Sequence, residues 1–141
     1  MSIDGIRWKA VNARFISSCL IGLVLFFNLQ CAFLFILFPQ QYRTQFDLNI
    51  PVGTSVVQAI GILFLMWNVP YVIAFIHPIK YRVSLVESII MQGIGVFGET
   101  LILTTNIFLP ANTQDSLLRF IIFDTVGLFL LLTAFFLTRK S

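Results

Sequence analysis

The sequence predicts an all-α protein, an antiparallel four-helix bundle that spans a membrane, and three observations lead to this prediction. Of the 141 residues, 58% are hydrophobic and only 11% are charged, whereas a soluble domain is about half apolar and about a quarter charged. The apolar residues form four long runs, and the charged residues lie mostly between them. Each run has the length of about 17–25 residues that a helix needs to cross a bilayer. We therefore expect one transmembrane domain over residues 1–141.

The four apolar runs predict transmembrane helices at residues 15–38, 52–76, 85–109 and 117–137. The first two carry no charged residue, and the second is interrupted by Pro70, which lacks a backbone donor and kinks a helix. The third carries Glu99 and the fourth carries Asp124, each well inside its run. Because the connections between the runs are short, consecutive helices are expected to lie antiparallel.

The first connection, PQQYRTQFDLNIP at residues 39–51, is more than a linker. Tyr42 and Phe46 lie four residues apart, with polar side chains between and beside them and a proline at each end. This pattern predicts a short amphipathic helix in the membrane interface, in the first external loop. An irregular loop is the alternative.

Two further predictions concern the opposite end of the bundle. Ser84 and Glu87 have the spacing of a capping box, in which Ser84 is the N-cap of the third helix and Glu87 is at N3. Tyr71 and Tyr81 fit an aromatic belt at the membrane surface, where rings with a polar end are enriched.

The positions of the basic residues predict that both termini face the cytoplasm. Seven of the nine Lys and Arg residues lie on the side that carries the termini: Arg7, Lys9, Arg14, Lys80, Arg82, Arg139 and Lys140. Only Arg43 and Arg119 lie toward the other side. Basic residues are enriched in the cytoplasmic loops of membrane proteins. No segment has the pattern of a targeting signal, which favours a bacterial inner membrane as the location.

Several classes of function are not expected. The basic residues form no stripe with interleaved aromatics, so no nucleic-acid partner is expected. His77 is the single histidine, and no Glu-x-x-His or Cys-x-x-Cys pair occurs, so neither a metal nor a cofactor is expected. No phosphate-binding glycine loop or nucleophile elbow is present, so no catalytic residue is assigned.

Polar side chains inside the four runs are the most informative feature of the sequence. Counted at about 1.5 Å per residue from the outer helix ends, four of them lie at similar depths on four helices: Asn28, Gln58, Glu99 and Asp124. Asn68 and Gln92 form a deeper pair. Helical spacing places these residues on faces that can converge on one polar interior. Trp67, close to Pro70, is too deep for the interface and is expected to wall a cavity or to fill a kink.

The expected protonation state of the two acids follows from their surroundings. A carboxylate in hydrocarbon is costly, and no Lys, Arg or His is expected at the depth of Glu99 and Asp124. We therefore expect at least one of the two to be protonated at neutral pH. Three readings fit this pattern: a neutral acid that only holds the bundle together, an acid with a proton-coupled or ligand-binding role, and, least favoured, a metal site.

Two segments and the overall layout carry a family resemblance. The segments are the proline-started external stretch FPQQYRTQFDL and the glycine-bearing start of the second run, PVGTSVVQAIG. Together with the four spans, they resemble small four-helix integral membrane proteins of the DoxX-like type. The resemblance implies the same four-span fold. It implies no activity or site residue, because members of this family are mostly uncharacterised.

From these features we expect a membrane protein that binds a lipid-like or small amphipathic molecule in its polar interior, and we favour a non-enzymatic role. Trp67 would be a wall of the site, whose polar lining is expected to be Glu99, Asp124, Asn68 and Gln92. The first alternative is an accessory or assembly subunit that binds a protein partner in the membrane. The second is a membrane enzyme that acts on a lipid or a quinone, with Glu99 as its acid or base.

Overall fold

The computed structural model describes the backbone of residues 3–139 and the side chains of residues 11–139. All the regular secondary structure in this part of the chain is helical, as expected. The helices are α1 (Ile3–Leu37), α2 (Pro39–Gln45), α3 (Gly53–Trp67), α4 (Val69–Ile76), α5 (Arg82–Thr105) and α6 (Ala111–Arg139). The basic side chains of Arg7, Lys9 and Lys140, which entered the prediction of orientation, lie outside the described residues.

Four stretches of helix are long and apolar enough to cross a membrane: Val11–Leu37, Gly53–Ile76, Arg82–Thr105 and Ala111–Arg139. This confirms the predicted number of spans, although several of their boundaries differ. The third span begins and ends earlier than the predicted range of 85–109. The fourth begins directly after Pro110, because the carbonyl oxygen of Pro110 accepts the first helical hydrogen bond, from the backbone N–H of Gln114 (3.0 Å).

The second span is divided at Asn68 into α3 and α4, as the position of Pro70 predicts. Pro70 lies in the first turn of α4, where a missing backbone N–H leaves no helical bond unmade. The side chain of Asn68 donates from Nδ2 to the carbonyl oxygen of Phe64 (2.6 Å). The interruption is therefore held in place by a local hydrogen bond.

The short helix expected in the first loop is present as α2, and it packs against the end of the bundle. The rings of Tyr42 and Phe46 lie 4.8 and 5.5 Å from the ring of Phe35 in α1, measured between centroids. Asp47 follows with a positive φ of 54°, which aspartate tolerates better than most residues. Its carboxylate accepts a hydrogen bond from Oγ1 of Thr113 (2.8 Å). The loop is thus tied to both α1 and α6.

The predicted capping box of the third span is wrong. The helix α5 begins at Arg82, because the carbonyl oxygen of Tyr81 accepts its first hydrogen bond, from the backbone N–H of Leu85 (3.3 Å). Ser84 consequently lies inside the first turn, and no side-chain cap is formed. Glu87 is exposed on the first turns of the helix.

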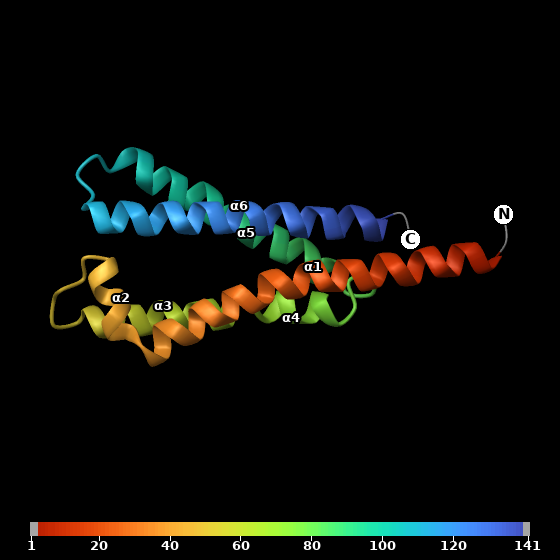
Figure 1. Ribbon diagram of the computed structural model, residues 1–141, viewed down its shortest axis with the longest axis horizontal. Coiled ribbons are helices and arrows are strands. Elements are labelled where there is room, and N and C mark those ends of the chain that lie inside the picture. Colours follow the sequence, from red (N-terminus) through yellow and green to blue (C-terminus); the bar gives the residue numbers. More distant parts are fainter. Residues whose placement is uncertain (1–2, 140–141) are drawn as a thin grey trace.

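The packing of the helices leaves one side of the bundle less closed than the others. The helix α1 packs against α3, α4 and α6, and α5 packs along α6 and against α4. The partners of α3 are α1, α2 and α4. Figure 1 shows that the distance between the α5–α6 pair and the helices α1 and α3 widens toward the end of the bundle that carries α2. The ring of helices is therefore closed where α4 meets α5 and wider where α3 faces α5.

The hydrophobic core lies in the half of the bundle that contains α4. Its members, each with at most 8% of its surface exposed, are Ile21, Val24, Leu25, Tyr71, Ala74, Leu85, Leu131 and Ala134. In the same half, Oγ of Ser17 donates to the carbonyl oxygen of Ala134 (3.1 Å) and joins α1 to α6. The half of the bundle that contains α4 is therefore the more tightly packed half.

Gly61 permits the close contact of α3 with α1. A Cβ at this position would lie 2.9 Å from the carbonyl oxygen of Ala32 and 2.8 Å from Cγ1 of Ile36. We predict that Gly61→Ala lowers the free energy of unfolding by about 1–3 kcal/mol, the usual cost of overpacking, because the backbone of α1 has to move. Gly93→Ala is the control, since a Cβ there meets no atom within 4 Å. Equal unfolding midpoints of the two variants in a titration with SDS would contradict this packing.

Candidate functional site

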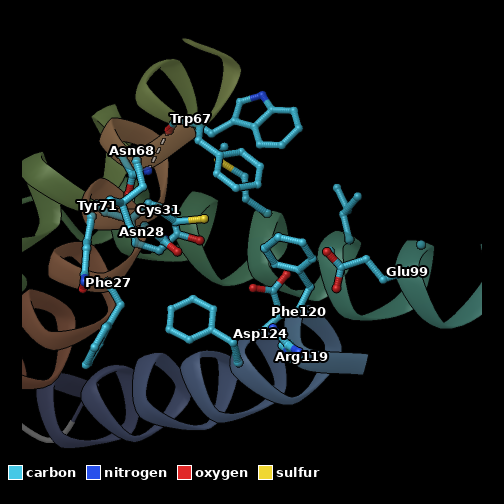
Figure 2. A pocket seen from close by; sticks show the side chains of 18 of the residues that line it. Phe27, Asn28, Cys31, Trp67, Asn68, Tyr71, Glu99, Arg119, Phe120 and Asp124 are labelled. Carbon is cyan, nitrogen blue, oxygen red and sulfur yellow. Dashed lines mark hydrogen bonds between the residues drawn. The ribbon is translucent and has the colours of Figure 1, made fainter. Parts of the chain in front are cut away.

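A cavity of about 720 Å³ lies between the spans, in the half of the bundle nearer to α2. Most of its lining is apolar, and six aromatic side chains contribute to it: Phe27, Phe64, Trp67, Tyr71, Phe120 and Phe123. Its polar side chains are Asn28, Gln30, Asn68, Glu99, Arg119 and Asp124. Figure 2 shows the labelled members of both sets arranged around one space. All four spans therefore contribute to a single site.

A chain of hydrogen bonds closes the floor of this cavity. The hydroxyl of Tyr71 donates to Oε1 of Gln92 (2.6 Å), and Nε2 of Gln92 donates to Oδ1 of Asp124 (2.8 Å). Tyr71 and Gln92 are each only 3% exposed. The chain joins α4, α5 and α6. The prediction that Tyr71 belongs to a belt at the membrane surface is wrong, because its hydroxyl finds its partners inside the bundle.

Two glycines make room for this hydrogen-bond chain. A Cβ at Gly95 of α5 would collide with Oδ2 of Asp124. A Cβ at Gly127 of α6 would lie 2.7 Å from Nε2 of Gln92. Small residues let membrane helices approach until their polar groups can bond. Because both positions lack a side chain, Asp124 and Gln92 can each lie against the facing helix.

Two polar atoms beside the cavity have no hydrogen-bond partner in the part of the chain that the structure describes. They are Oε2 of Glu99 and Oδ1 of Asn68, and both are buried. Asn68 is only 3% exposed, and its Nδ2 is already used by the carbonyl oxygen of Phe64. A buried polar atom without a partner is costly, and no water is available in hydrocarbon to supply one. A carboxylate and an amide oxygen both accept hydrogen bonds, so a bound molecule with donors could satisfy them.

The structure brings most of the predicted site residues together. Five of them line the cavity: Asn28, Trp67, Asn68, Glu99 and Asp124. Gln92 lies beneath it, in the hydrogen-bond chain. Gln58 lies apart from the cavity lining, and its Nε2 donates to the carbonyl oxygen of Ile36 in α1 (3.2 Å).

The prediction that Asp124 lies at the same depth as Glu99 is wrong, because α5 and α6 have other ends than the sequence predicts. The helix α6 extends further toward its N-terminus than predicted, so Asp124 lies about 20 Å from that end rather than about 10 Å. The helix α5 ends earlier, so Glu99 lies about 9 Å from its C-terminus rather than about 15 Å. Asp124 is consequently at the level of Gln92 and bonds to it, rather than at the level of Glu99.

The aromatic lining is the main part of the site that the sequence reading missed. The sequence analysis assigns no phenylalanine to the site, yet four of these rings line the cavity: Phe27, Phe64, Phe120 and Phe123. Helical spacing carried the missing signal, since Phe120 lies four residues before Asp124 and shares its face. Gln30 and Arg119, which the sequence analysis did not assign to the site, also line the cavity.

Within the described residues, no group of three or more His, Cys, Asp or Glu side chains is placed to hold a metal ion. Cys19 and Cys31 are both free thiols. The groups that can contact a bound molecule in this site are therefore mainly carboxyl, amide and aromatic groups.

No protein-family model matches the chain, and no match was found among curated proteins or solved structures. The resemblance to DoxX-like proteins stays a prediction. The cavity is thus the feature from which a function can be inferred.

We predict that Gln92→Leu destabilises the bundle by about 1–2 kcal/mol. The substitution removes two hydrogen bonds between helices, at about 0.6 kcal/mol each on average in membranes. It leaves Oδ1 of Asp124 without its partner, whereas the hydroxyl of Tyr71 keeps the carbonyl oxygen of Ser88 (3.1 Å) as an acceptor. Gln30→Leu is the matched control, because Gln30 is exposed and its side chain bonds to no other described residue. Melting in detergent, followed by circular dichroism, compares the two variants. Equal melting temperatures would mean that the hydrogen-bond chain contributes nothing to stability.

Proposed function

We propose that the chain is an integral membrane protein that binds a lipid-like or small amphipathic molecule between its spans. The cavity itself supports this proposal. Its volume of about 720 Å³ falls within the range of about 300–1,000 Å³ that is usual for small-molecule sites, while voids larger than a water molecule are few in packed interiors. Its aromatic walls suit an apolar body, and its few polar groups suit a polar head.

The surroundings of the cavity support access from the bilayer. Three lining residues, one on α3 and two on α5, also lie on the outer surface of the bundle: Trp67 (50% exposed), Ile94 (65%) and Ile102 (45%). The helix α3 packs against α1, α2 and α4, whereas α5 packs against α4 and α6. We therefore place the opening between α3 and α5, where a molecule dissolved in the membrane could enter sideways.

We place the spans antiparallel in the membrane, with both termini on the cytoplasmic side. Lys80 and Arg82 lie between α4 and α5, and Arg139 ends α6. These residues lie on the side opposite to α2, whose basic residue is Arg43. The bias of basic residues supports this orientation, in which the cavity lies toward the outer leaflet. A bacterial inner membrane stays our proposed location.

The alternative function, an accessory subunit of a larger membrane complex, would use the outer surface rather than the cavity. The outward face of α5 offers exposed apolar side chains for such contacts at Ile90, Phe97 and Leu101. In that case the polar interior would only fix the packing of the bundle. An enzymatic role would require Glu99 to act on a molecule bound in the same cavity, so binding is the first property to test.

Gly98 and Gly93 offer a matched pair of variants for this test. A Cβ at either position meets no atom within 4 Å, but only Gly98 lines the cavity. We predict that protein purified in a mild detergent carries a bound molecule detectable by native mass spectrometry. Gly93→Phe should keep this molecule, and Gly98→Phe should lose it because the ring fills the cavity.

Equal retention of the molecule by both variants would contradict binding in the cavity. The accessory role would be favoured if neither the unsubstituted protein nor either variant carries a bound molecule and a membrane protein copurifies with all three.

A further inference from the structure

The two buried polar atoms left free beside the cavity are both hydrogen-bond acceptors. Oδ1 of Asn68, a residue only 3% exposed, and Oε2 of Glu99 have no partner among the described residues. Asp124 uses one carboxyl oxygen to accept the hydrogen bond from Gln92, and its other oxygen lies against Gly95. A molecule that satisfies this site must therefore bring donors.

The same site concentrates acidic groups. Asp124 touches α5 at Gly95, and Glu99 lies one helical turn further along, at about 6 Å of rise. Figure 2 shows both carboxyl groups on the same side of the cavity, with Phe120 beside them. Arg119 also lines the cavity, but it is exposed and donates no hydrogen bond to either acid among the described residues. Neither Glu99 nor Asp124 has a basic partner among the described residues, so a cationic group on a ligand would complement them.

The walls near the two acids are aromatic. Phe120 and Phe123 precede Asp124 on α6, and Phe64 and Trp67 line the cavity from α3. Figure 2 shows Trp67 across the cavity from Phe120 and Asp124. The face of an aromatic ring attracts a cation placed within about 6 Å of its centroid. Acidic groups and aromatic faces together favour an organic cation over a neutral or anionic molecule.

We propose, on the basis of the binding function proposed above, that the ligand is a lipophilic amine bound in its protonated form. The ammonium group lies between Glu99 and Asp124 and donates hydrogen bonds to their carboxyl oxygens. Its apolar part lies along the aromatic walls and points toward the opening between α3 and α5. Oδ1 of Asn68 marks the place where a second donor on the ligand would bind.

Fluorescence of Trp67 tests this proposal in the full chain. Trp8 and Trp67 are the two tryptophans, so Trp8→Phe leaves Trp67 as the single emitter in phosphatidylcholine nanodiscs. The probes are dodecylammonium and dodecanol, each with a bromine on its terminal carbon to quench the indole. Dodecylammonium should quench Trp67 in a saturable manner, whereas dodecanol should quench only in proportion to its content in the bilayer.

Substitutions at Glu99 decide whether the charge is recognised. Glu99→Gln should weaken the saturable quenching by dodecylammonium about tenfold or more, as expected for loss of a charge-assisted hydrogen bond, and Glu99→Asp should largely keep it. Glu87→Gln is the matched control, because it removes a carboxylate from an exposed position on the same helix.

The outcomes separate the two proposals. Two results would overturn the amine proposal and leave the binding function intact. In the first, both probes quench Trp67 in a saturable manner and reach half-saturation at the same content in the bilayer. In the second, only dodecanol does so. Equal effects of Glu99→Gln and Glu87→Gln would also overturn it. An absence of saturable quenching by either probe would overturn both proposals.

Discussion

The hydrogen bond from Gln92 to Asp124 is the interaction on which the shape of this bundle depends. In hydrocarbon, a polar group has to find its partner inside the protein. Both polar atoms of the Gln92 side chain have such a partner, because Oε1 accepts a hydrogen bond from Tyr71 (2.6 Å) and Nε2 donates one to Asp124 (2.8 Å). The three residues join α4, α5 and α6 beside the packed core. The half of the bundle that contains α4 is therefore closed, and the cavity lies in the other half, where α3 and α5 are not closely packed against each other.

The cavity is costly for a protein of this size. A void deprives its lining of dispersion contacts, and the free oxygens of Glu99 and Asn68 add the cost of unpaired polar atoms. A bundle selected for stability alone would fill this space or pair these atoms. A bound amphipathic molecule does both, which is why we favour a binding function over a purely structural role for the polar interior.

Composition and periodicity were sufficient to predict the four spans, the break in the second span and the short helix α2. They also placed Glu99, Asp124, Asn68, Asn28 and Trp67 around one interior, because the face of a helix follows from spacing within that helix. The pairing of Gln92 with Asp124 could not be predicted in this way. It depends on the register between α5 and α6, which is set by where each helix begins and ends. The aromatic lining was missed for a different reason: helical spacing places Phe120 on the face of Asp124, but an apolar ring beside a polar residue was not counted as part of the site.

The central claim of this account is that the space between α3 and α5 is open to the bilayer and holds an apolar chain. Met91 lines the cavity, whereas Met66 of α3 is 60% exposed and is absent from the cavity lining. The most direct test is nuclear Overhauser spectroscopy on methyl-labelled methionine in otherwise deuterated protein, in nanodiscs of protonated lipid. The account predicts cross-peaks from acyl-chain protons to the methyl groups of both Met91 and Met66. Cross-peaks to Met66 alone would show that the helices close over the cavity and would contradict it.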